Sequence, residues 1–117
     1  MRHDDDRSDS SGFRHIRLQE LIIEELRSLL RDDVTDPELY GVEIAALVLS
    51  VDYRHARAHF TIAGGEAAAK ARRADVERAF ARATPFLRAR LAEAIEMKRV
   101  PDLRFVFDAA APNVEGA

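Results

Sequence analysis

The 117-residue sequence contains no cysteine, no tryptophan and only five glycines. Without cysteine, the chain forms no disulfide and offers no thiolate, which fits a reducing compartment. No run approaches the roughly 20 apolar residues that a membrane-spanning helix needs. The N-terminus is acidic, whereas a secretory signal begins with basic residues and continues with apolar ones. These absences predict a cytoplasmic protein that does not bind membranes.

The sequence also lacks the motifs of cofactor and metal chemistry. It has no Walker loop, no glycine-rich dinucleotide turn and no His-Glu zinc motif. His55 and His59 share a face of a predicted strand, but extended chain separates them by about 13 Å, too far for one metal ion. No Ser-His-Asp grouping has local support. We therefore expect no catalytic residue, no metal, no cofactor and no small-molecule substrate.

The charge of the chain is distributed unevenly. The net charge is −3, with 6 Lys/Arg and 13 Asp/Glu in residues 1–53. Residues 54–101 hold 11 Lys/Arg and 5 Asp/Glu, a local charge of +6. A polyanion responds to the local field more than to the total charge. The middle of the chain is thus a candidate nucleic-acid surface, although arginine-rich helices also occur simply because they are well solvated.

The length predicts one domain, residues 13–108, between two tails. Residues 1–12 are rich in Asp and Ser and bury nothing, which is typical of a disordered acidic tail. Residues 109–117 are mostly small and form a mobile C-terminal tail. A helix over residues 14–33 follows from its apolar spacing, and Ile16 and Ile23 widen its apolar side enough to pack hard on a sheet.

Two strands and a third, shorter one are predicted around a helical segment. Residues 42–51 are nearly all apolar, as in a well-buried strand, and residues 54–63 alternate between apolar and polar side chains. Asp52 lies at the turn between them and Asp36 at an earlier turn, where capping is their expected role. Residues 103–107 alternate again and predict the third strand.

Residues 66–101 are predicted to form two helices joined by a sharp break at Ala83-Thr84-Pro85-Phe86. A proline disfavours helical geometry in the residue before it, so Thr84 is expected to cap a second helix whose first turn holds Pro85. The unpaired N–H groups at the start of that helix lie beside Arg78, Arg82 and Arg88. Together they predict a phosphate-binding site. The alternative is a kink between two core helices with surface charge around it.

The predicted order is helix, strand, strand, helix, helix, strand, an α+β fold with the helices on one face of a three-stranded sheet. A helix–break–helix between strands resembles the core of a KH domain, where a GxxG loop grips RNA. The glycines here lie at positions 12, 41, 64, 65 and 116, so no GxxG is present. A KH-like fold without the usual loop is expected.

Four stretches together resemble the ribosome-binding factor A family of bacterial small-subunit assembly factors. They are the opening helix from Arg17-Leu18 to Leu29-Leu30-Arg31, the turn Asp36-Pro37 with Leu39, the hairpin from Val48 to Ala58, and the segments Phe86-Leu87-Arg88 and Val100 to Asp108. The resemblance covers about residues 14–108. It implies a type-II KH-like domain whose helices meet at a kink.

The family resemblance also implies a function. Its members bind the immature 30S subunit near the 5′ end and decoding region of 16S rRNA and support late processing of the precursor. The implied protein is a non-enzymatic RNA-binding factor for ribosome biogenesis, and we expect a monomer. The candidate RNA-binding residues are Arg78, Arg82, Thr84, Pro85, Arg88, Lys70, Arg73, Arg90 and Arg57, with Arg72 and His55 as further candidates.

One departure and two alternatives accompany this interpretation. The family usually kinks its helices at Ala-x-Gly, whereas this chain has Ala83-Thr84-Pro85, which exchanges a flexible glycine for a stiff proline. One alternative function is a KH-like module that binds free RNA. The other is a protein-interaction module that uses the alanine-rich start of the helical segment.

Overall fold

A computed structural model describes the backbone of residues 2–109 and the side chains of residues 12–109. Its elements, in chain order, are α1 (Arg2–Asp32), the 3-10 helix η1 (Pro37–Leu39), β1 (Val42–Leu49), β2 (His55–Ile62), α2 (Gly65–Ile95) and β3 (Asp102–Phe107). The strands form one sheet in the order β1-β2-β3. The β1–β2 pair is antiparallel and the β2–β3 pair is parallel. The predicted α+β architecture is confirmed.

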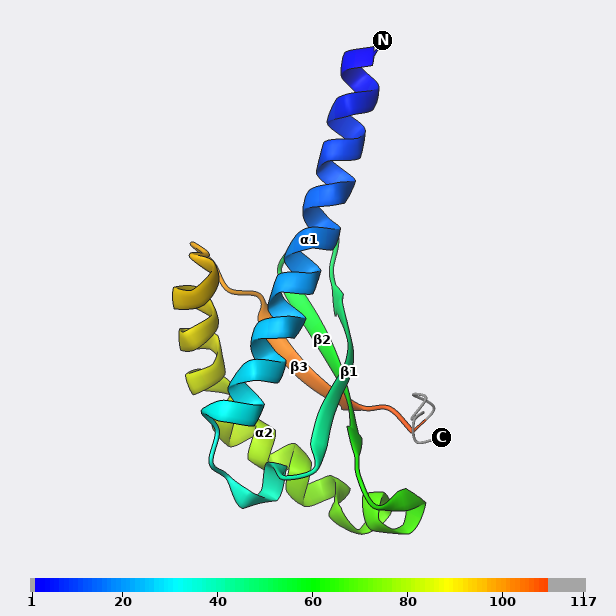
Figure 1. Cartoon of the computed structure of the whole chain (residues 1–117), viewed down its shortest axis with the longest axis vertical. Coiled ribbons are helices and arrows are strands. Elements are labelled where there is room, and N and C mark those ends of the chain that lie inside the picture. The colour runs from blue at the N-terminus through cyan, green and yellow to red at the C-terminus, as the bar shows by residue number, and fades with distance from the viewer. Residues whose placement is uncertain (1, 110–117) are drawn as a thin grey trace.

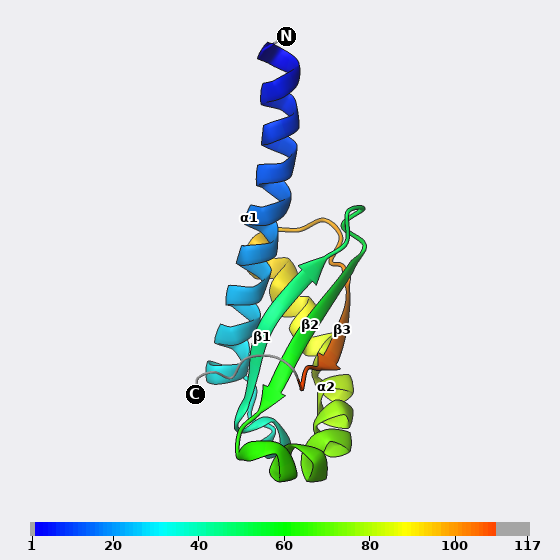
Figure 2. The same ribbon diagram turned by 90° about the vertical axis from the view of Figure 1, so that its right-hand side faces the viewer.

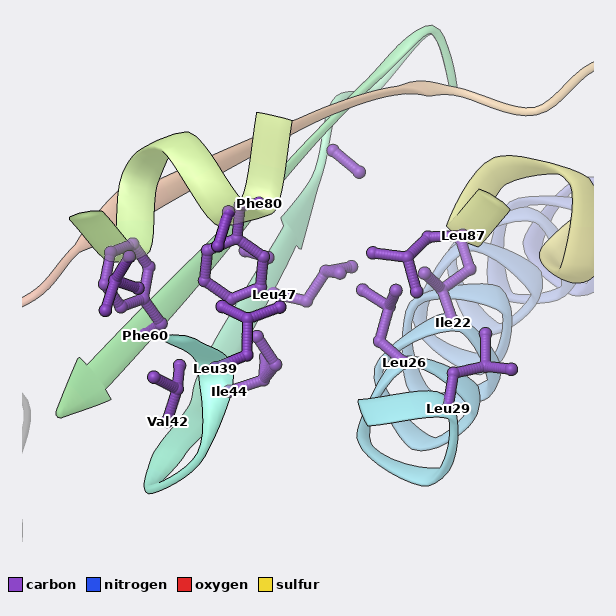
Figure 3. Packing of buried hydrophobic residues seen from close by; sticks show 14 of the residues in the cluster. Ile22, Leu26, Leu29, Leu39, Val42, Ile44, Leu47, Phe60, Phe80 and Leu87 are labelled. Carbon is purple, nitrogen blue, oxygen red and sulfur yellow. The ribbon is translucent and has the colours of Figure 1, made fainter. Parts of the chain in front are cut away.

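Both helices lie on one face of the sheet, and no described element covers the other face (Figures 1 and 2). The core therefore fills the single layer between helices and sheet. Phe60 of β2 and Phe80 of α2 meet there with ring centroids 5.0 Å apart. On the side of α1, Leu87 points toward Ile22 and Leu26 (Figure 3). These contacts fix α1 and α2 against the same sheet.

The strand predictions are correct in position and, for β2, in facing. Ala56, Ala58 and Phe60 are fully buried, while His55 and Arg57 are exposed. This is the alternation expected when only one face of a strand is covered.

The first strand is less buried than its apolar run predicted. Glu43 and Val48 of β1 are exposed because the outward face of the sheet has no cover. A register shift between Ile44 and Ala46 inserts one extra residue, so Ala45 and Ala46 are both exposed. The bulge returns Leu47 to the core side.

Helix α1 seals the outer edge of β1 with polar side chains. The Gln19 side-chain oxygen accepts a 2.9 Å hydrogen bond from the Leu49 N–H. His15 Nε2 lies 2.9 Å from the Leu49 carbonyl oxygen. The Arg27 Nε donates to the Ile44 carbonyl at 3.0 Å. These contacts occupy backbone groups that an edge strand otherwise leaves open.

Helix α1 differs from its prediction at its N-terminal end. It begins at Arg2 and not at residue 14, and its first turns project beyond the sheet (Figure 1). Extending an existing helix costs far less than nucleating one, so the body of α1 supports these turns. The division of the chain at residues 12 and 108 stays a prediction.

Helix α1 packs on the sheet as predicted, but Ile16 takes little part in that contact. Its side chain is 53% exposed, whereas Ile23 is partly buried against the core. Ile16 lies near the projecting part of α1, where less of the sheet lies beside the helix.

The helical segment is one helix and not two. Helix α2 runs without interruption from Gly65 to Ile95 with Pro85 inside it. It bends midway, so the predicted change of direction is present although the predicted break is not (Figures 1 and 2). Thr84 does not cap a new helix: its hydroxyl donates a 2.7 Å hydrogen bond to the Phe80 carbonyl one turn back.

This bend has two physical causes. Proline removes one backbone hydrogen bond and pushes against the preceding turn, which kinks a helix without ending it. A threonine hydroxyl that bonds back to the carbonyl four residues earlier bends helices in addition. Because the helix continues, its N–H groups after Pro85 follow the helical bonding pattern and do not form a free helix start.

Turn residues behave as the sequence predicted. Asp36 Oδ1 accepts from the Glu38 N–H at 3.0 Å, and Asp52 Oδ1 accepts from the Arg54 N–H at 3.0 Å. The C-terminal tail prediction, residues 109–117, lies outside the described residues except for Ala109. Among the described helices, none is both long and apolar enough to cross a membrane.

Candidate nucleic-acid interface

The candidate interface is the surface of α2, which carries eight of the nine predicted RNA-binding residues. Its inward side is fixed by buried residues such as Val76, Phe80 and Leu87, so the cations between them are distributed around the rest of the helix. The structure sorts these cations into three groups according to what their side chains contact.

The first group is three arginines that bind the connector between α1 and β1 or the residue just before it. Arg72 donates to the Glu38 carbonyl at 2.7 Å, Arg82 lies 2.9 Å from Asp36 Oδ2, and Arg90 lies 3.1 Å from Asp33 Oδ2. All three partners lie in or just before the turn that contains η1. These arginines join α2 to the end of α1 across more than 30 residues of sequence.

Asp36 is at the centre of this contact. The hydrogen bond from Arg82 is the largest cause that lowers the pKa of Asp36 below its ordinary value, and the bond from the Glu38 N–H adds to it. The Arg82 side chain is nevertheless 58% exposed, so its guanidinium is still open to solvent on one side. The pair is a surface ion pair, and such pairs exchange partners at little cost.

The second group is Arg88 alone, which holds the entry to β3. Its guanidinium donates to the Val100 and Pro101 carbonyls, each at 3.2 Å, and lies 3.1 Å from Asp102 Oδ1. A planar guanidinium with several donors suits this kind of fork. Arg88 therefore fixes where the chain enters the sheet after α2.

The third group forms ion pairs only within α2, or none. Arg78 pairs with Asp75 one turn away, and Arg73 pairs with Glu77 at 3.0 Å. Arg73 also lies 5.2 Å from the centre of the Phe107 ring. Lys70 is exposed and takes part in no ion pair among the residues that the structure describes. These side chains are the most available to a polyanion.

Arg57 lies apart from α2, on the uncovered face of the sheet. In the sheet register it is the neighbour of Arg104 on β3 and of Val48 on β1. Arg104 was not among the predicted candidates, although the alternation of residues 103–107 already put it on the other face of the strand from Phe105. His55 and His59 on the same face lie near carboxylates, at 3.9 Å from Asp102 and 3.5 Å from Asp108.

The predicted cluster of Arg78, Arg82 and Arg88 is not one constellation. The three guanidiniums have separate partners: Arg78 contacts Asp75, Arg82 contacts Asp36, and Arg88 contacts Asp102 at the start of β3. Pro85 is exposed and Thr84 is half-buried. The described residues contain no group of three or more His, Cys, Asp or Glu that could hold a metal ion. Which of these residues touch RNA stays a prediction.

Comparison with known proteins decides the family. A family model described as Ribosome-binding factor A matches residues 14–115. The chain belongs to the ribosome-binding factor A family. Ribosome-binding factor A of Heliobacterium modesticaldum is 39% identical over 98 residues, which cover 84% of this chain and 78% of that protein. The protein of the same name from Halorhodospira halophila is 38% identical over 94 residues, or 80% and 72% of the two chains.

Solved structures agree with the family assignment and with the predicted KH-like fold. The crystal structure of ribosome-binding factor A from Thermus thermophilus is 26% identical with a TM-score of 0.68, covering 84% of this chain and 99% of that one. A Thermus thermophilus homology model fitted into the cryo-EM map of a 30S complex is 27% identical with a TM-score of 0.63. It covers 81% of this chain and 96% of the other.

Proposed function

We propose that this protein binds the immature small ribosomal subunit and assists the late maturation and processing of precursor 16S rRNA in the cytoplasm. It acts as a monomeric binding factor and not as an enzyme. The proposal is based on family membership and on the Thermus thermophilus homology model that was fitted into the map of a 30S complex. The basic composition of residues 54–101 supports an RNA surface.

Within this proposal we rank the candidate contacts by what each side chain already binds. Arg78 and Lys70 bind phosphate at the least cost, because neither holds a distant part of the chain. Arg82 follows, since its exposed ion pair with Asp36 is exchangeable. Arg88 and Arg72 come last because their donors already bind backbone carbonyls of the chain. Arg57 belongs to a separate surface on the open sheet face.

The proposal is tested by co-sedimentation of the purified protein with precursor small subunits, mature small subunits and protein-free 16S rRNA. We expect binding to the precursor, weakened in Arg78→Glu. The matched control is Arg31→Glu, which makes the same charge change on an exposed arginine of α1 and is expected to bind like the wild type.

Three outcomes separate the functions considered. Equal affinity for protein-free rRNA and for precursor subunits supports a free-RNA module in place of an assembly factor. Equal affinities of Arg78→Glu and wild type remove the outward side of α2 from the interface. No binding by folded protein at low salt refutes the proposal itself.

A further inference from the structure

The two outer edges of the sheet are treated differently in this fold. At β1, side chains of α1 occupy the open backbone groups, as with Gln19 on the Leu49 N–H. At β3, no described strand lies on the outer side. Figure 2 shows β3 at the border of the sheet. Among the described residues, the β1 edge is bound by side chains of α1 and the β3 edge has no neighbouring strand.

The register shows which backbone groups face the open edge. The Asp102 N–H donates to the Arg54 carbonyl, and the Asp108 N–H donates to the Phe60 carbonyl, both toward β2. Residues that bond to one neighbour alternate along a strand, so the N–H and C=O groups of Leu103, Phe105 and Phe107 point outward. They form a row of donors and acceptors about 7 Å apart.

The same three residues leave the core incompletely covered at this edge. Their register partners on β2, Ala56, Ala58 and Phe60, are fully buried. Leu103, Phe105 and Phe107 are only partly buried, although they pack against the same core. Another strand beside β3 would cover this remaining apolar surface and pair the outward backbone groups.

No proline, inward-pointing charge or bulge lies within β3. Natural edge strands are blocked by proline, by inward-pointing charges or by bulges. The only proline here, Pro101, precedes the strand, and the two charged side chains, Asp102 and Arg104, are exposed. The β2–β3 register runs without a shift from Asp102 to Phe107.

We infer that the β3 edge binds an extended polypeptide segment of a small-subunit protein by strand addition. The segment has apolar side chains toward α2, where they cover Leu103, Phe105 and Phe107. This inference rests on the proposed function, because the partner is a protein of the small ribosomal subunit that α2 is proposed to bind. Arg73 and Arg88 of α2 lie at the two ends of β3, which makes the edge continuous with the basic surface.

A polypeptide fits this edge better than a second copy of the chain. Two copies paired around Phe105, the register that uses all three outward residues, would set Asp102 opposite Asp108, and like charges directly opposite are destabilising. A polypeptide also supplies donors and acceptors at the same spacing as β3, which strand addition requires.

Amide hydrogen exchange tests the inference without changing the chain. The protein is exchanged free, bound to intact small subunits, and bound to protein-free 16S rRNA, then released by high salt, quenched and read by NMR. On intact subunits the amides of Leu103, Phe105 and Phe107 should slow at least about tenfold. Amides of Arg104 and Val106, which already face β2, are the internal control and should change little.

The remaining outcomes overturn the inference. Equal protection of the three amides on protein-free rRNA assigns the edge to RNA. Protection that rises with protein concentration in the free sample assigns it to a second copy. Unchanged exchange in all samples, with salt-sensitive co-sedimentation intact, removes the edge from the interface and leaves the proposed function standing.

Discussion

Phe80 packs α2 against the sheet. Its side chain is 1% exposed, and its ring stacks on Phe105 of β3 with centroids 4.0 Å apart. It also contacts Phe60 of β2 at 5.0 Å. One side chain therefore joins the helix to two strands, and Phe80→Ala should loosen α2 from the sheet.

The expected magnitude follows from burial and ring contacts. Truncating a buried phenylalanine to alanine costs about 3–5 kcal/mol through lost transfer free energy and the cavity left behind. Domains of this size unfold with a free energy of about 5–15 kcal/mol. Phe80→Ala should thus remove a large part of the stability, and Tm should fall by at least about 12 °C.

Phe86 supplies a matched control six residues further along α2. Its side chain is 41% exposed, and Arg90 lies 5.7 Å from the ring centre. Phe86→Ala should cost less than about 1 kcal/mol. Urea unfolding of both variants, followed by circular dichroism, measures the difference. Equal losses in the two variants, or a loss under about 1.5 kcal/mol for Phe80→Ala, would refute this account of the core.

Three further predictions concern polar contacts. The pair with Arg82 lowers the pKa of Asp36, so it stabilises the fold above the ordinary carboxylate pKa. This stability is lost as the pH falls through the folded-state pKa, so Tm should fall less below about pH 4 in Asp36→Asn than in the wild type. Parallel curves of Tm against pH for the two proteins would contradict this. Gln19→Ala leaves the Leu49 N–H without its partner, so the free energy of unfolding in urea should fall by about 1–3 kcal/mol. Light scattering should also show more self-association. A variant with the stability and the association of the wild type would show that α1 does not seal the β1 edge. Arg88→Ala should lower Tm more than Arg78→Ala, because Arg88 binds two carbonyls and a carboxylate; the reverse order would contradict its structural role.

The strands could be predicted because their signals are local. Alternation along residues 54–63 and 103–107 reports which side chains face the core, and the structure agrees. The exposed half of β1 was missed because an apolar run gives no sign of which face is uncovered. The order of the strands was also out of reach, since it depends on how the chain returns after α2.

The candidate site was harder to predict because its contacts are long-range. Spacing placed Arg78 and Arg82 one turn apart, but nothing local indicates that Arg82 pairs with Asp36, 46 residues away. Similarly, Pro85 gave a clear signal for a change of direction. A proline alone does not show whether a helix ends or only bends; here the helix continues, and Leu87 and Leu91 after the proline are buried.

The most direct test of the account is the salt dependence of binding to isolated ribosomal subunits. If α2 contacts about five phosphates, log K should fall against log salt with a slope of about −3.5 on the small subunit. The large subunit should bind weakly at every salt concentration. Equal affinity for both subunits, or small-subunit binding that does not respond to salt, would contradict an interface built on the cations of α2.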